Sequence, residues 1–145
     1  MTNRVETIME AVAAAVTGLA TTETRVQRAR AWPVSSLPAL SVFQGENRVL
    51  EGEDWPMGVI GRELTFSIVS QIKAITNLET IANQICAEVY AALTADRTLG
   101  LPYVFDLNLV SDSALDIEAE QDEPTARQVM TWAVIYEHSE TSTEA

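Results

Sequence analysis

Two segments of the chain, 62–74 and 127–138, alternate apolar and polar residues. A period of two is typical of a β-strand that has one face against a core. In the first segment Leu64, Phe66, Ile68 and Ile72 share one face, and polar residues share the other. The pattern therefore predicts a long, half-buried strand in each segment.

The second segment is unusual because both of its faces are apolar. One face carries Met130, Trp132, Val134 and Tyr136. The other carries Val129, Thr131, Ala133 and Ile135. A face made of small and β-branched residues suits a sheet and needs a cover. Because only two convincing helices are available to cover a sheet, we expect part of the cover to come from another subunit.

The two helices are predicted from apolar residues that recur at three- and four-residue steps. The first follows a cap at Thr2 or Asn3 and ends near Gly18, and the second follows a cap at Asn77. The apolar stripes consist of Val5, Ile8, Met9, Val12, Val16 and Leu19 in the first helix, and of Leu78, Ile81, Ile85, Val89 and Leu93 in the second.

The remaining segments predict a hairpin and one further strand. A short strand over 40–44 is followed by a polar stretch over 45–58, before a long strand begins near Val59. Loops of this length are uncommon in compact domains and are usually functional when they occur. Another strand is expected over 103–111, with an irregular continuation to 119 and a turn at 122–124.

The order of these elements predicts an α+β fold with a mainly antiparallel sheet of about four strands and two helices packed on it. A chain of 145 residues is long enough for one core and short for two. We therefore expect a single domain over 1–139 and a flexible polar tail over 140–145.

Charge and hydropathy narrow the possible partners. The formal net charge is −12, from 21 acidic and 9 basic residues, which disfavours a direct grip on nucleic acid. No apolar run reaches the length needed to span a bilayer, so we expect a soluble protein without a membrane partner. Cys86 is the single cysteine and is interpreted as a small buried residue on a helix.

Candidate catalytic chemistry is sparse. The single histidine, His138, falls at the expected fraying end of the last strand, where a surface or pH-sensing role is favoured over catalysis. The usual nucleophile, zinc, phosphate-loop and dinucleotide motifs are absent from the sequence. We therefore expect no enzyme, no cofactor and no metal.

Two stretches are rich in acids, although neither has the spacing of a calcium loop. They contain Asp112, Asp116, Glu118, Glu120, Asp122 and Glu123, and Glu46, Glu51, Glu53 and Asp54. A solvated acidic face explains them most simply. A surface that faces a polyanion or a basic partner, a divalent-metal site and a pair of catalytic carboxylates remain open alternatives.

Arginines and one tryptophan stand out against the acidic background. Arg25, Arg28 and Arg30 either clamp a phosphate or form salt bridges to acids of a neighbouring subunit or of the same sheet, and we favour the salt bridges. Trp55, beside Pro56, either tucks under its own hairpin or anchors a partner.

The order and pattern of these elements resemble the tail terminator proteins of long-tailed bacteriophages, including the lambda-like tail terminator fold. The resemblance rests on the N-terminal helix, the connector Arg25-Val-Gln-Arg-Ala-Arg30, the segment Leu37-Pro-Ala-Leu-Ser-Val42, the polar hairpin and the closing Val134-Ile-Tyr-Glu137. It involves nearly the whole chain and contains no diagnostic motif.

The resemblance implies a virion protein without catalytic activity. Such proteins form a hexameric ring that caps the tail tube, stops its polymerisation and joins the tail to the head connector or a head-completion protein. Assembly would take place in the host cytoplasm, and DNA would pass through an acidic lumen without specific binding.

The site residues follow from regions of the chain. We expect Arg25, Arg28, Arg30 and Arg62 to lie at the subunit interface, and Arg48, Glu51, Glu53, Asp54 and Trp55 to lie on the loop that docks on the tail tube or neck. A head-completion or neck connector protein of the same virion is the alternative. A small adaptor and a carboxylate-based enzyme are the other classes that the sequence allows.

Overall fold

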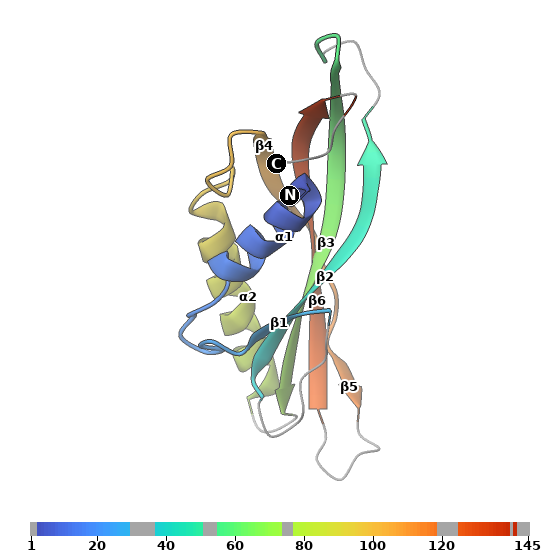
Figure 1. Cartoon of the computed structure of the whole chain (residues 1–145). Coiled ribbons are helices and arrows are strands. Elements are labelled where there is room, and N and C mark those ends of the chain that lie inside the picture. The colour runs from blue at the N-terminus through green and yellow to red at the C-terminus, as the bar shows by residue number, and fades with distance from the viewer. Residues whose placement is uncertain are drawn as a thin grey trace.

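The computed structural model describes residues 3–29, 37–50, 55–73, 77–118, 125–139 and 141. In this part of the chain, two helices lie on one side of a tall, six-stranded sheet (Figure 1). The elements are, in order, α1 (Arg4–Ala15), β1 (Val26–Arg28), β2 (Ala39–Val49), β3 (Val59–Lys73), α2 (Leu78–Thr94), β4 (Val104–Asp112), β5 (Asp116–Glu118) and β6 (Thr125–Ser139).

The strand order of the sheet is β1-β2-β3-β6-β4, and β5 pairs with β6 beside β4. Only the β1–β2 pairing is parallel among the described strands. The α+β class and the mainly antiparallel sheet are therefore confirmed. The expected number of about four strands counts the long ones and leaves out β1 and β5, whose three residues each are too short to show an alternating pattern. β5 lies within the irregular continuation that was expected up to 119.

The centre of the sheet is the ribbon formed by β3 and β6. Each strand has 15 residues, and their pairing runs from Val59 opposite Ser139 to Lys73 opposite Thr125. These are the two strands that the alternating pattern predicts. Their helix-facing sides carry Leu64, Phe66, Ile68 and Ile72 on β3 and Met130, Trp132, Val134 and Tyr136 on β6, all of them buried.

The hairpin between β2 and β3 differs from its prediction. β2 continues past Gln44 to Val49, so that Arg48 lies in a strand instead of a loop. A bulge between Gln44 and Asn47 accommodates the polar residues that made this stretch look like a loop. The connection is therefore 50–58, of which 51–54 lie outside the described residues.

The two helix starts behave differently. Asn3 caps α1 as expected, because its side-chain oxygen accepts a hydrogen bond from the backbone N–H of Glu6 at 2.8 Å. Asn77 precedes α2 in the left-handed conformation, with φ at 68°, and makes no side-chain cap bond. Asn77 therefore occupies the predicted N-cap position, where its carbonyl accepts from Ile81, but its side chain does not cap the helix, since a capping side chain acts from an extended backbone.

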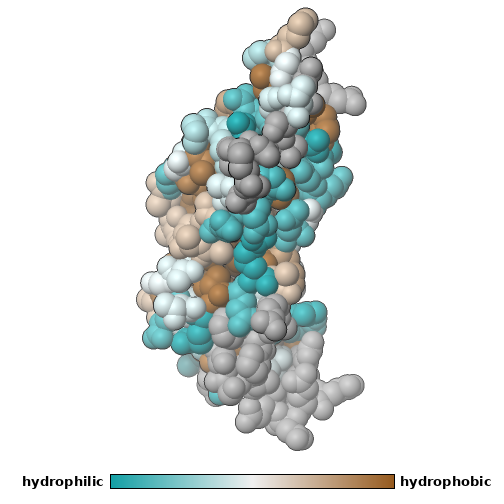
Figure 2. All heavy atoms as spheres, in the orientation of Figure 1, coloured by the Kyte–Doolittle hydropathy of each residue, from teal (hydrophilic) through white to brown (hydrophobic). Residues whose placement is uncertain are grey.

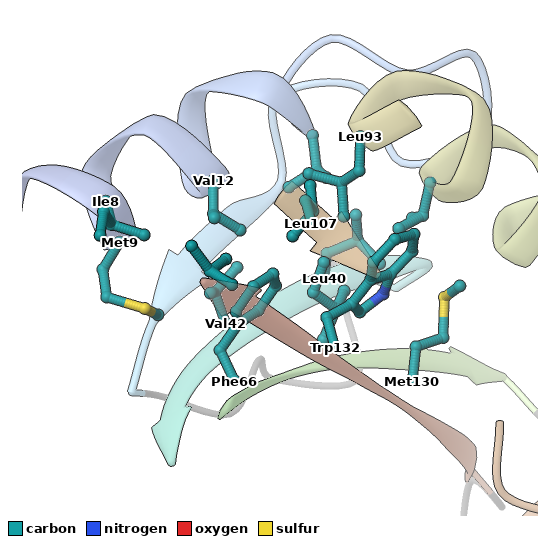
Figure 3. Close-up of a cluster of buried hydrophobic side chains, with 14 of the residues drawn as sticks. Ile8, Met9, Val12, Leu40, Val42, Phe66, Leu93, Leu107, Met130 and Trp132 are labelled. Carbon is teal, nitrogen blue, oxygen red and sulfur yellow. The ribbon is translucent and has the colours of Figure 1, made fainter. Parts of the chain in front are cut away.

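The core lies between the helices and the sheet (Figure 3). Ile8, Met9 and Val12 of α1 point toward the sheet, and the Phe66 and Trp132 rings stack at its centre with centroids 6.5 Å apart. The outer helix surfaces are weakly hydrophobic. Pale brown residues gather over the helices at the left of Figure 2, and hydrophilic residues lie along the sheet beside them.

Candidate assembly surface

The side of the sheet that faces away from α1 and α2 has no helical cover in the described part of the chain (Figure 1). Cross-strand pairs on this helix-free face include Val69 with Val129 and Ser67 with Thr131. Val129, Thr131 and Ile135 are half-buried, and Ala133 is buried between its neighbours. The second apolar face that the sequence predicts on the last strand is thus present, and it lies where another chain can reach it.

Trp55, which precedes β3, lies on the same face. A Cβ added to Gly61 would lie 2.1 Å from the Trp55 ring, so the indole rests directly on the backbone of β3. Trp55 also meets Phe105 of β4 edge to face, with centroids 5.4 Å apart and an interplanar angle of 66°. Of the two interpretations of Trp55, the structure shows the tucked position.

This aromatic corner keeps an open side. Trp55, Pro56, Phe105 and Glu137 line a pocket of about 510 Å³. Phe105 is 52% exposed, although it is a large apolar side chain. The corner therefore combines a fixed tryptophan with an accessible apolar surface, as interface anchors do.

Of the other residues of the expected docking loop, the structure describes only Arg48. Arg48 forms an ion pair with Glu63 on the adjacent strand at 3.1 Å. The Arg48 side chain is 59% exposed, so this pair contributes little to stability. Glu51, Glu53 and Asp54 lie outside the described residues, and their docking role stays a prediction.

The described arginines of the expected interface make contacts within their own chain. Arg25 pairs with Glu23 at 3.1 Å and donates to the carbonyl oxygens of Pro38 and Thr21. Arg28 pairs with Glu6 and so links β1 to α1. Because intrachain acceptors occupy these donors, a phosphate clamp loses support. Arg30 lies outside the described residues, and the role of all three in contacts between subunits stays a prediction.

The sequence interpretation placed His138 at a frayed strand end, and the structure contradicts this placement. His138 is 4% exposed, and its Nε2 accepts a hydrogen bond from Arg62 Nε at 2.7 Å. Its Nδ1 lies 2.6 Å from the carbonyl oxygen of Ser139. Because Nε2 faces the Arg62 donor, Nδ1 is the ring nitrogen that can donate to this carbonyl, and both nitrogens have partners within the chain. The pairing of β6 with β3 continues through His138 to Ser139, which explains the burial.

Arg62 borders a polar pocket that sequence reasoning missed. The pocket has a volume of about 320 Å³ and is lined by Asn3, Val5, Glu6, Gln44, Asn47, Arg62 and Tyr136. The Tyr136 hydroxyl donates to Asn47 Oδ1 at 3.1 Å. Strand parity already places Arg62, Tyr136 and His138 on the helix-facing side. The bulge in β2, which brings Asn47 beside them, has no signal in the sequence.

Metal-ion and thiolate chemistry have little support in the described part of the chain. These residues include no group of three or more His, Cys, Asp or Glu side chains that could hold a metal ion. Burial, with a smaller effect from Asp112, raises the pKa of the Cys86 thiol, so the thiolate is disfavoured. No helix among the described elements is both long and apolar enough to cross a membrane.

Comparisons with known proteins give matches among solved structures and not among family models or curated proteins. No family model matches the sequence, and no curated protein matches it significantly. Solved structures do match. A chain described as "Virion of native gene transfer agent (GTA) particle" aligns with a TM-score of 0.52 over 88% of this chain and 84% of that chain, at 19% sequence identity. The likeness is one of fold. In total, 36 chains of solved structures match.

Proposed function

We propose that this protein is a structural component of a phage-like virion, and specifically a tail terminator. Six copies form a ring that caps the tail tube, terminates its polymerisation and joins the tail to the head connector. The observation that carries the proposal is the fold shared, over most of both chains, with a chain of a gene transfer agent virion. The order of elements, which resembles that of tail terminators, supports the specific role.

The helix-free face supports assembly into a ring. Its half-buried residues, such as Val129 and Ile135, are apolar, and no helix of the described chain covers them. A ring joins each copy to the next through two different patches, and the contact closes without leaving an end exposed. In this proposal a neighbouring subunit covers part of the face.

The hairpin tip is the proposed contact with the tube or neck. Trp55, together with Phe105 of β4, forms the rigid aromatic part of this contact, and Met57, two residues after Trp55, is fully exposed. Arg48, Glu51, Glu53 and Asp54 would add the charged rim of the same contact. An aromatic anchor surrounded by polar groups is a common arrangement at protein interfaces.

The charge of the chain suits a conduit for DNA. A ring of six copies carries a formal charge of −72, six times the −12 of one chain. An acidic lumen repels phosphates and lets DNA slide without the adhesion that basic side chains create. The protein would then act in the virion after assembling in the host cytoplasm, with no catalytic step of its own.

A tube-growth assay tests this function. Purified tail-tube protein of the same particle would be polymerised with and without the protein, and tube lengths would be measured by electron microscopy. The proposal predicts short, capped tubes. Replacing Phe105 by Ser should weaken capping, whereas the control A91S, on the exposed surface of α2, should cap like the wild type. Tubes of unchanged length with the wild-type protein would refute the terminator role.

A further inference from the structure

The polar pocket beside Arg62 is not part of the surfaces assigned above. It opens at the bulge of β2, where Gln44 and Asn47 line it, and the first turn of α1 forms another wall. β1 pairs with β2 only at 40–42, so no described strand borders β2 along the bulge. The pocket lies at the margin of the sheet that β2 forms and is open to solvent.

Arg62 differs from four other described arginines in its partner. Arg25, Arg28, Arg48 and Arg97 each form an ion pair with a carboxylate of the same chain. Arg62 instead donates Nε to the ring of His138. Among the described residues no acceptor lies within hydrogen-bond distance of its two terminal nitrogens. A guanidinium held through Nε presents these nitrogens as a fork that fits a carboxylate.

The other groups in the pocket add donors and little negative charge. Asn47 uses its oxygen to accept from Tyr136, which leaves the amide nitrogen available to donate. Gln44 contributes a second side-chain amide. Glu6 is the acidic residue of the lining, and its charge is balanced by Arg28. A carboxylate entering the pocket therefore meets one unbalanced cation and neutral donors.

We propose that this pocket receives an aspartate side chain from a second copy of the chain, with Arg62 as the residue that binds it. The inference rests on the proposed ring and names a contact that holds neighbouring subunits together. The aspartate that enters the pocket is Asp112 or Asp116 of the neighbouring copy.

In a ring, each patch meets a different patch on the neighbour. The pocket lies at the β2 margin of the sheet, and the strand order places β4 and β5 on the opposite side of the β3–β6 ribbon. Asp112, at the end of β4, and Asp116, at the start of β5, are both exposed there. With 21 acids and 9 bases in the chain, a basic side chain is the scarcer element of such a contact.

Sedimentation velocity over a range of protein concentrations tests the contact. R62Q removes the guanidinium, and K73Q is the matched control, since it removes one exposed positive charge at the far end of β3. R62Q should raise the concentration at half-assembly at least about tenfold, the loss expected when a charged hydrogen-bond partner is removed from an interface. K73Q should assemble like the wild type. The double variant D112N/D116N should match R62Q, and combining all three changes should add little.

If R62Q loses its cooperative melting, the contact is tested instead on the wild-type ring, with a soluble carboxylate that competes for Arg62. Sodium glutarate, a soluble dicarboxylate, should dissociate the ring, whereas sodium chloride of equal ionic strength should not. Equal effects of the two salts would overturn the proposal, as would assembly of a folded R62Q or of D112N/D116N at wild-type concentrations. In those cases the ring itself stands. A wild-type protein that stays monomeric, alone and with tube protein, would refute the ring and this contact together.

Discussion

Trp55 lies across Gly61 so closely that a methyl group on Gly61 would be 2.1 Å from the indole ring. Gly61 pairs with Glu137 on the helix-free face of the sheet, and Trp55 meets Phe105 there as well. One glycine near the start of a long strand thus leaves room for Trp55 against the sheet. Glycine in a strand often marks such a close approach, at some cost to the strand itself.

Replacing Gly61 by Ala should displace the Trp55 ring. We expect a loss of about 1–3 kcal/mol in the free energy of unfolding, as for other overpacked sites. Tryptophan fluorescence should shift at the same time, because the indole becomes more exposed to water. The control is the double-mutant cycle with W55A: in that background G61A should cost much less. An equal cost in both backgrounds would show that the ring does not occupy this position.

Phe66 should be one of the most sensitive positions in the core. It is fully buried and stacks on Trp132 at a centroid distance of 6.5 Å. F66A should lower the free energy of unfolding by about 3–5 kcal/mol, measured by urea denaturation. T65A, the next residue on the opposite face of β3, is the control and should cost far less. Similar losses for the two variants would contradict the assignment of the core to the helix-facing side.

The contact between Thr21 and Glu88 should make stability depend on pH. Burial alone would raise the pKa of Glu88, but hydrogen bonds from the Thr21 hydroxyl and backbone N–H and from Gln84 outweigh it, and the pKa is lowered. A carboxyl group with a lowered pKa in the folded protein adds stability above its ordinary pKa of 4.5, and this stability is lost as the pH falls through the lowered value.

Thermal melting at several pH values checks this dependence. E88Q should melt below the wild type at neutral pH, and the two melting temperatures should converge in acid. E10Q, at an exposed position of α1, should follow the wild type throughout. A constant difference between E88Q and the wild type at all pH values would contradict the explanation based on ionisation.

Val129 tests the proposed use of the helix-free face. V129D places a charge among half-buried apolar residues, where a neighbouring subunit would have to desolvate it. We expect the ring to be lost while circular dichroism and cooperative melting are retained. A91D puts the same charge on the exposed surface of α2 and should leave assembly unchanged. A V129D protein with the wild-type mass would remove this face from the interface.

Salt should promote assembly. Six chains of −12 repel one another, and both screening and divalent cations reduce that repulsion. Sedimentation between low and physiological ionic strength, with and without magnesium, should show the ring fraction rising with each addition. A ring that is most stable at very low ionic strength without divalent ions would contradict the charge argument.

The long elements could be predicted because their patterns are repeated many times. The period of two in β3 and β6 and the apolar stripes of α1 and α2 place their buried faces correctly. β1 and β5 could be predicted only loosely, since three residues carry no periodic signal and their pairing depends on neighbours. The irregular continuation expected up to 119 includes β5, but its bounds and its separation from β4 could not be inferred. The extension of β2 was missed because its polar residues look like a loop, and a bulge has no composition of its own.

The candidate site was harder to predict than the fold. The charge of Arg62 singled it out in the sequence, but its partner His138 was placed at a frayed strand end. Strand parity alone puts both residues on the helix-facing side. The intrachain ion pairs of Arg25 and Arg28 depend on where α1 and the preceding turn come to lie. Contacts of this kind arise from tertiary packing, which a single sequence pattern does not encode.

The most direct test of the central claim is the mass of the purified protein in solution. Light scattering coupled to size-exclusion chromatography would measure it across salt and magnesium concentrations, with and without polymerising tail-tube protein. The proposed function predicts a species of six times the 15.9 kDa chain mass, free or at the tube tip. A stable dimer, or a monomer that leaves tube growth unchanged, would contradict it.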